Sequence, residues 1–271
     1  MSAQSRIAST FAALKSAAFM PFFTIGDPDV ETTAALVTEA ARRGADLIEL
    51  GVPFSDPIAD GPTIQASYYR ALDRGFKVAQ VFELAKKLRA NGVTIPLVCM
   101  VSHSLVFKRG TGSFFRSARE AGYDGMIVPD LPAGYEGDAT VQAHAHGLEH
   151  IFLCAPTTTP ERRAQICAKS GGFIYYISVA GITGARDALP PDLEANVKDL
   201  KSRTKTPVCV GFGIGKSAQA AAVSKLADGV IVGSALVKLA AELHASGQSR
   251  EAVVAEVGAQ VEALARATHG K

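Results

Sequence analysis

The sequence predicts an α/β fold, a (β/α)8 TIM barrel with an extra N-terminal helix and inserted helices. Two observations favour it. Eight short apolar runs recur along the 271 residues, and an amphipathic helical segment follows most of them after a turn. Runs that are apolar on both faces are typical of parallel strands covered by helices, and eight such units in about 250 residues fit a closed barrel. A doubly wound open sheet is the structural alternative.

The predicted elements follow from these patterns in chain order. The strands are short runs rich in β-branched residues, over residues 18–25, 45–51, 95–101, 124–129, 150–156, 173–179, 207–213 and 228–234. Helices are expected between them over residues 30–44, 78–92, 113–122, 159–172 and 217–229. Three extra helices are expected over residues 5–16, between the second and third strands, and after residue 249. Because no linker or charge block divides the chain, we expect residues 1–271 to form one domain.

Local signals support the helix ends. Thr159 is a suitable N-cap because Pro160 follows it at the first helical position. Gly44 is a suitable C-terminal stop for the helix that begins at residue 30.

The overall charge and hydropathy exclude some classes of protein. The 28 basic and 26 acidic side chains nearly cancel, leaving a net charge of +2, so the composition does not favour binding to nucleic acid or to a membrane surface. No apolar run approaches the roughly 18 residues of a transmembrane helix, and the first residues lack an export cleavage pattern. A cytoplasmic protein is therefore expected.

The four cysteines indicate a reducing compartment. None belongs to a CxxC pair, and Cys99, Cys154 and Cys209 each lie inside an apolar run. We expect buried thiols that act as small hydrophobic side chains. A disulfide framework is not expected in a chain of this length with so large an apolar fraction.

The most informative segment is the second predicted strand with the loop after it. Side chains alternate between the faces of a strand, so we expect Glu49 to point into the barrel while Ile48 and Leu50 face the helices. Glu49 lies near the carboxyl end of its strand, where barrel enzymes carry their catalytic groups. Burial should raise the pKa of Glu49 towards the range of a general acid or base. The alternative is a buried glutamate that backbone donors or water satisfy.

Two aspartates, Asp56 and Asp60, follow in the loop. Prolines and glycines stiffen this loop, and a long loop in a compact domain often forms a lid or an interface. Either aspartate could instead cap a turn with its side chain. The spacing alone does not decide which of the two takes part in chemistry.

Three glycine-bearing turns after the last three predicted strands favour a phosphate site. They are residues 181–184, 211–215 and 233–234. Glycine lets backbone N–H groups approach an anion, and the helix expected after Ser234 would direct its N-terminus at one. The alternative is that each glycine serves only a tight turn, which explains any one of the turns well but all three together less well. Residues 211–217 are one residue short of a nucleotide P-loop, which excludes ATP or GTP binding.

Other chemistries lack the residues that they need. A Schiff-base aldolase requires a lysine on a barrel strand, and none of the predicted strands has one. A metal site requires clustered ligands, and of the six histidines only His103 lies at the carboxyl end of a strand. We therefore expect acid–base chemistry by carboxyl groups on a phosphorylated substrate, with no metal and no cofactor in this chain.

Several apolar and aromatic residues fall near the expected mouth of the barrel, where they could line a flat pocket. Each one alone is better explained as ordinary core. Tyr175 stands out because a buried phenol needs a hydrogen-bond partner. The set is Phe22, Met100, Ile127, Tyr175 and Phe212.

The run LIELGVPFSDPIADGPTIQ (47–65) closely resembles the signature of the tryptophan synthase alpha chain family. The resemblance extends along nearly the whole chain and includes FFTIGDPD (22–29), IVPDLP (127–132), YYISVAGITG (175–184) and GFGI (211–214). It implies a (β/α)8 barrel and a carbon–carbon lyase of tryptophan biosynthesis. Its reaction is the retro-aldol cleavage of indole-3-glycerol phosphate to indole and glyceraldehyde 3-phosphate.

The resemblance also implies roles for individual residues. Glu49 is the main acid–base group, which takes the proton from the glycerol hydroxyl and serves the protonation of indole C3. Asp60 holds the indole N–H and stabilises positive charge on the ring. Thr183 lies in a loop that closes over the substrate beside Asp60. The residues implied for the indole pocket are Phe22, Ile64, Met100, Ile127 and Tyr175, and those for the phosphate and glycerol end are Thr183, Gly184, Phe212, Gly213, Gly233 and Ser234.

By the same resemblance, the chain works with a tryptophan synthase beta subunit that carries pyridoxal phosphate and consumes the indole, in a heterotetramer of two alpha and two beta subunits. The loop with Pro53 and Asp56 is the implied docking surface. The sequence departs from the family at Val179, where an arginine is common, and at residues 185–186, where an acidic residue is common. These departures affect what the resemblance implies about closure of the loop with Thr183, but not what it implies about the reaction.

Two other functions remain as alternatives because a fold alone does not fix a function. A phosphosugar isomerase or epimerase would keep the phosphate turns but would need neither the aromatic pocket nor the loop from Glu49 to Asp60. A non-catalytic regulatory subunit would keep only the fold. The intact Glu49, Asp60 and glycine turns argue against the second alternative.

Overall fold

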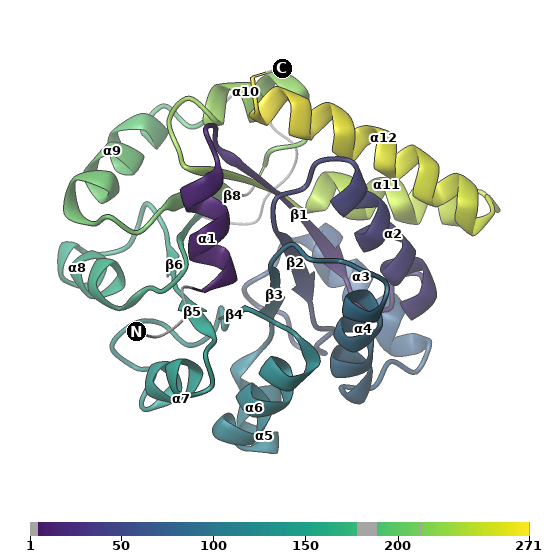
Figure 1. Cartoon of the computed structure of the whole chain (residues 1–271), viewed down its shortest axis with the longest axis horizontal. Coiled ribbons are helices and arrows are strands. Elements are labelled where there is room, and N and C mark those ends of the chain that lie inside the picture. The colour runs from purple at the N-terminus through teal and green to yellow at the C-terminus, as the bar shows by residue number, and fades with distance from the viewer. Residues whose placement is uncertain (1–4, 178–188, 212, 271) are drawn as a thin grey trace.

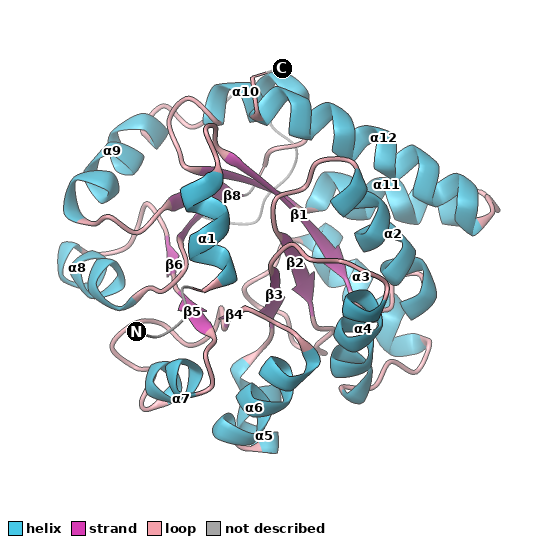
Figure 2. Cartoon of the chain, in the orientation of Figure 1, coloured by secondary structure: helices cyan, strands magenta, loops and turns pink. Residues whose placement is uncertain are grey.

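The computed structural model describes residues 5–177, 189–211 and 213–270, and its parallel strands form a barrel that helices surround (Figures 1 and 2). The strands are β1 (Ala18–Thr24), β2 (Ile48–Gly51), β3 (Leu97–Met100), β4 (Gly125–Ile127), β5 (Glu149–Ile151), β6 (Leu153–Cys154), β7 (Ile174–Ile177), β8 (Val208–Gly211) and β9 (Gly229–Val232). Their order in the sheet is β5-β4-β3-β2-β1-β9-β8-β7-β6. The strand pairings in the described part of the chain are all parallel, as expected for strands that are buried on both faces.

The barrel closes at the fifth predicted strand. The two outermost strands of the sheet order, β5 and β6, are consecutive in the chain and are separated only by Phe152. β5 pairs with β4 and β6 pairs with β7, while the N–H of Tyr175 donates to the carbonyl of Phe152 at 3.0 Å. The predicted run 150–156 is therefore one strand position that the structure divides in two. The sequence prediction of a (β/α)8 barrel is confirmed.

The helices cover the outside of the barrel. They are α1 (Arg6–Ala13), α2 (Val30–Arg42), α3 (Pro62–Asp73), α4 (Ala79–Ala90), α5 (His103–Arg109), α6 (Thr111–Ala121), α7 (Ala139–Ala145), α8 (Pro160–Lys169), α9 (Leu193–Arg203), α10 (Ser217–Val223), α11 (Ser234–Ala245) and α12 (Arg250–Thr268). Thr159 caps α8 as predicted, and its side chain accepts from the N–H of Arg162. In the described part of the chain, no helix is long and apolar enough to cross a bilayer.

One predicted helix is too long. We expected a helix over residues 217–229, but α10 ends at Val223. The Ser224 hydroxyl donates to the carbonyl of Ala221, and this kind of back-bonding competes with continuation of a helix. The chain must also turn here to bring Gly229 beside Cys209 in the sheet. Tertiary pairing therefore overrides the local helical pattern.

The core has two layers, because side chains alternate between the inside of the barrel and the helices. In β1, Met20 and Phe22 belong to the interior cluster, whereas Phe19 and Phe23 pack under the helices. Ile7 of α1 joins the interior cluster, and α1 lies across the middle of the barrel in Figure 1. The helix α1 thus closes the amino-terminal end of the barrel and leaves the carboxyl ends of the strands for a site.

A buried aspartate connects several segments at the amino-terminal end of the barrel. Asp124, 1% exposed, pairs with Arg6 of α1 at 2.6 Å and with Arg89 of α4 at 2.7 Å. Its side chain also accepts from the backbone N–H of Leu97 at 2.9 Å. The carboxylate thereby joins α1, the end of α4 with the start of β3, and the residue before β4.

Candidate active site

Glu49 points into the barrel, as the alternation of side chains predicted. Its neighbours in the chain, Ile48 and Leu50, lie in the outer cluster under the helices. Its partners across the sheet are Phe22 of β1 and Val98 of β3, which both belong to the interior cluster. The strand β2 therefore presents a carboxyl group among apolar side chains near its carboxyl end.

The carboxyl group of Glu49 is buried and has no described hydrogen-bond partner. The residue is 3% exposed, and neither carboxyl oxygen has a hydrogen-bond partner among the residues that the structure describes. Burial, with a contribution from the charge of Asp60, raises the pKa of Glu49 to about 8. A carboxyl group with such a pKa exchanges protons near neutral pH. The alternative, a glutamate satisfied by backbone donors, finds no support in the described chain.

Asp60 ends the loop that follows β2. The loop is attached to α3 by Gln65, whose side-chain amide donates to the carbonyls of Asp60 at 2.8 Å and of Pro57 at 3.2 Å. Asp60 itself is half-buried. Burial and the charge of Asp130 raise the pKa of Asp60 to about 7. A second carboxyl group with a raised pKa therefore lies within electrostatic reach of Glu49.

Both carboxyl groups line one cavity at the carboxyl ends of the strands, with about 470 Å³ of empty space. Of the five residues expected in an indole pocket, four line it; Ile127 is fully buried in the interior cluster and is not among them. The lining is Phe22, Glu49, Asp60, Gly61, Ile64, Met100, Tyr175, Gly213, Ile214, Ile231, Gly233 and Ser234. Sequence reasoning missed Gly61, Ile214 and Ile231.

The expected phosphate end lies in the same cavity. Gly233 is the N-cap of α11 and Ser234 is its first residue, so the N-terminus of this helix opens into the cavity. Gly213 lines it with a φ of +76°, a left-handed conformation that favours glycine. The other predicted residues of this end, Thr183, Gly184 and Phe212, lie outside the described residues, as do Val179 and residues 185–186.

A missing side chain makes room beside Glu49. A Cβ atom on Gly51 would lie 2.3 Å from the Phe22 ring and 2.8 Å from the Tyr68 hydroxyl. Glycine at this position lets both aromatic side chains pack into the barrel mouth. Sequence reasoning missed Tyr68, although it lies four residues after Ile64 and so on the same face of α3.

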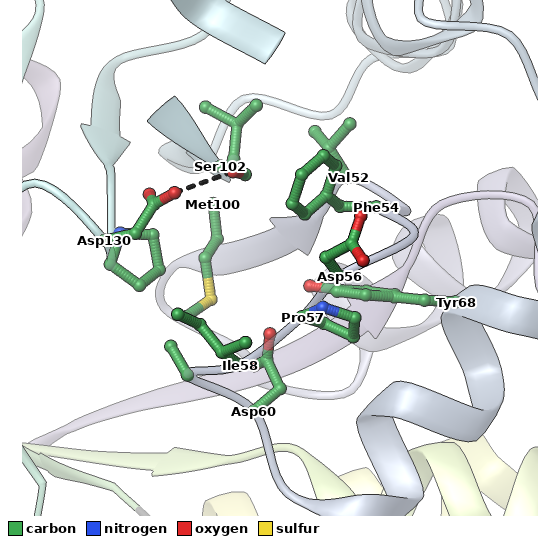
Figure 3. Close-up of a pocket in the computed structure, with 13 residues that line it drawn as sticks. Val52, Phe54, Asp56, Pro57, Ile58, Asp60, Tyr68, Met100, Ser102 and Asp130 are labelled. Atoms are coloured by element: carbon green, nitrogen blue, oxygen red, sulfur yellow. Dashed lines mark hydrogen bonds between the residues drawn. The ribbon is translucent and has the colours of Figure 1, made fainter. Parts of the chain in front are cut away.

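A second cavity of about 350 Å³ adjoins the first, and Asp60 and Met100 line both (Figure 3). Asp56 and Asp130 line only the second one. Asp56 is exposed and accepts from the Ser55 hydroxyl, whereas Pro53 is buried. The geometry therefore separates the two loop aspartates, because only Asp60 shares a cavity with Glu49.

Among the described residues, no lysine lies on a strand and no group of three or more potential metal ligands occurs. Cys99, Cys154 and Cys209 are buried free thiols, as predicted. His103, the histidine expected at the carboxyl end of a strand, is the first residue of α5, which follows β3.

Comparison with known proteins shows the family of this chain. The family model described as tryptophan synthase alpha chain matches residues 9–269. The chain belongs to the tryptophan synthase alpha chain family. A tryptophan synthase alpha chain of Rhodopirellula baltica is 48% identical over 83% of this chain and 82% of its own length. That of Acidiphilium cryptum is 44% identical over 98% of both chains.

A solved structure of a tryptophan synthase alpha subunit has the same fold as this chain. Tryptophan synthase subunit alpha from Legionella pneumophila superposes with a TM-score of 0.90 and 34% sequence identity, covering 99% of this chain and 100% of that one. The reaction of the tryptophan synthase alpha chain family is the one implied by the sequence, a carbon–carbon lyase reaction that cleaves indole-3-glycerol phosphate.

Proposed function

We propose that this chain cleaves indole-3-glycerol phosphate with Glu49 as the acid–base group and Asp60 as the group that holds the indole N–H. One observation carries the proposal. A fully buried carboxyl group without a hydrogen-bond partner in the described chain faces a cavity that it shares with a second carboxyl group of raised pKa. A buried carboxyl group without a hydrogen-bond partner lowers the stability of the fold. Such a loss of stability is expected where the group serves to interact with a substrate.

The proton transfers follow from this arrangement. The protonated carboxyl group of Glu49 gives its proton to indole C3, which makes the ring cationic, and the Asp60 carboxylate beside the ring N–H stabilises that charge. The ionised form of Glu49 then removes the proton from the glycerol hydroxyl. The bond between indole C3 and the glycerol carbon breaks, its electron pair returns to the ring, and the former hydroxyl carbon becomes the aldehyde of glyceraldehyde 3-phosphate. The cleavage requires no oxidant or reductant.

The walls of the cavity suit the two ends of this substrate. Phe22, Ile64, Met100 and Tyr175 offer an apolar surface for the flat indole ring. At the other end, the N-terminus of α11 with Gly233 and Ser234 offers backbone N–H groups to the phosphate. Ile127 supports this pocket from the barrel interior rather than from the lining.

The proposed partner is a tryptophan synthase beta subunit, in a complex of two alpha and two beta subunits. One chain in the crystal structure of a tryptophan synthase complex from Pyrococcus furiosus superposes on this chain with a TM-score of 0.83 and 36% identity, covering 92% of this chain and 98% of that one. The exposed Asp56, with the loop that contains Pro53, is the proposed docking surface. Pyridoxal phosphate belongs to the beta subunit in this proposal, and the lyase reaction uses side chains of this chain alone. We also propose a cytoplasmic location, because the buried free thiols of Cys99, Cys154 and Cys209 indicate a reducing compartment.

The test is to incubate the purified chain with indole-3-glycerol phosphate and to measure indole release with and without a tryptophan synthase beta subunit. We expect slow release by the chain alone and much faster release with the beta subunit. A folded chain that binds a glycerol phosphate analogue but releases no indole in either case would contradict the proposal. That result would favour the isomerase or the regulatory alternative.

A further inference from the structure

The second cavity contains a carboxylate that the proposed function leaves without a role. Asp130 lies in the loop after β4, three residues beyond the end of that strand, and so at the same end of the barrel as Glu49. It lines the second cavity together with Asp60 and Met100. In the view of Figure 3, Met100 lies between the two aspartates. Sequence reasoning did not single out Asp130, although it directly follows the predicted strand 124–129 and an acidic residue near the carboxyl end of a barrel strand is the signal that identified Glu49.

The carboxylate of Asp130 is held in place at both oxygens. The Ser102 hydroxyl donates to Oδ2 at 2.7 Å, and the backbone N–H of His103 donates to Oδ1 at 2.8 Å. Ser102 is the N-cap of α5 and His103 is its first residue. The loop after β4 is thereby fastened to the start of α5, and the negative charge of Asp130 has a fixed position.

We propose that Asp130 is a positioning residue of the lyase site, which presents a fixed negative charge to Asp60 across the cavity that the two share with Met100. The inference rests on the proposed function, because it assigns Asp130 a role through Asp60. Asp130 touches no reacting atom in this proposal. Its function is to make the carboxylate of Asp60 a stronger acceptor for the indole N–H and to add to the negative potential that a cationic indole ring experiences.

The surroundings of Asp60 contain no described counter-charge that would cancel this effect. Neither cavity is lined by a lysine, an arginine or a histidine among the described residues. Burial and the charge of Asp130 together hold the pKa of Asp60 near 7. The titratable groups that face Asp60 are Glu49 from β2, Tyr68 from α3, Tyr175 from β7, Asp56 from its own loop and Asp130 from the loop after β4.

The effect should be modest and should depend on salt. Asp130 is exposed to solvent, so mobile ions screen its charge. Interactions between exposed charges change equilibria by about two- to fivefold. A role confined to holding the loop in shape would not respond to salt in this way.

The decisive variant is Asp130→Asn, which removes the charge and keeps the shape. Its amide oxygen can accept from the N–H of His103, and its amide nitrogen can donate to the Ser102 hydroxyl. We expect carboxyl ¹³C NMR to show a lower pKa for Asp60 than in the wild-type chain. The rise of kcat/KM with pH that follows ionisation of Asp60 should move to lower pH, while the plateau should fall by about two- to fivefold. Both differences should shrink at high salt.

A matched control is Asp138→Asn. Asp138 is also an exposed aspartate at the start of a helix, where its side chain accepts from the side-chain amide of Gln142, and it lines neither cavity. We expect wild-type titration of Asp60 in this variant. In the wild-type chain, added salt should lower the pKa of Asp60, a measurement that needs no variant to fold.

Two results separate this inference from the proposed function. If Asp60 titrates identically in the wild type and in Asp130→Asn, and salt leaves the wild-type titration unchanged, the role of Asp130 is overturned. Full turnover by Asp60→Asn would instead overturn the role of Asp60 in the reaction. The NMR titration would still decide whether Asp130 acts on Asp60, because it requires no turnover.

Discussion

Glu49 and Asp60 line one cavity from the two ends of a single connection, Glu49 from β2 and Asp60 from the residues just before α3. Burial raises the pKa of both carboxyl groups, to about 8 and about 7, and the charge of Asp60 adds to the shift at Glu49. Two carboxyl groups whose charges interact in this way take up and release protons as a pair. The activity of this site should therefore depend on pH around neutrality.

Replacing the acid–base group should remove the activity. In Glu49→Gln the side chain keeps its shape but cannot take a proton from the glycerol hydroxyl. We expect indole release to fall by about 10³-fold or more. Binding of glycerol phosphate, measured by calorimetry, should persist because Gly233 and Ser234 are untouched. Near-wild-type turnover would show that Glu49 is not the catalytic group.

Replacing Asp60 should be severe but less complete. Asp60→Asn retains an oxygen that can accept the indole N–H, and it loses the negative charge that stabilises the cationic ring. Loss of one such electrostatic contact typically costs about 10²-fold in kcat. The measurement is the rate of indole release at saturating substrate, with Asp56→Asn as the matched loop variant. An unchanged rate for Asp60→Asn would mean that Asp60 only shapes its loop.

The stability of the chain should respond to the ionisation of Glu49. In the unfolded chain the pKa of a glutamate is near 4.5, and in the folded chain that of Glu49 is about 8. The folded state therefore binds the proton more tightly, and the wild type loses stability as pH rises from about 4.5 to about 8. Glu49→Gln lacks this loss.

Denaturant unfolding at two pH values tests this expectation. At pH 9 the variant should exceed the wild type by on the order of 3–5 kcal/mol in free energy of unfolding. The two should be close at pH 4, where the carboxyl group is protonated in both states. A pH-independent difference would show that Glu49 is not held in a raised-pKa environment.

Asp124 should matter for stability and not for chemistry. Replacing it with asparagine leaves the guanidinium groups of Arg6 and Arg89 facing a neutral side chain at the closed end of the barrel. Removing one partner of a buried ion pair costs about 3–5 kcal/mol. Removing Glu242, whose pair with Lys238 is exposed, should cost less than about 1 kcal/mol. Equal losses in the two variants, measured by thermal unfolding, would contradict the anchoring role of Asp124.

Local rules predicted much of the fold. The strands were recognisable because β-branched apolar runs alternate with amphipathic helices, and the direction of Glu49 followed from the two-residue period of a strand. The N-cap of α8 at Thr159 was readable from its own side chain and from Pro160. The end of α10 was predicted too late, because the local helical pattern carries no information on the pairing of Gly229 with Cys209.

By itself the sequence determined the barrel, the position of Glu49 at the carboxyl end of a strand, and the family to which the segment 47–65 belongs. Only the tertiary structure decided that Asp60, and not Asp56, shares a cavity with Glu49. It also decided that the carboxyl oxygens of Glu49 have no hydrogen-bond partner among the described residues, and that Asp130 lines a cavity with Asp60. The reason is that these relations join loops from different strands. Their distances are set by closure of the barrel and by side-chain packing, and neither is encoded in the spacing of residues along the chain.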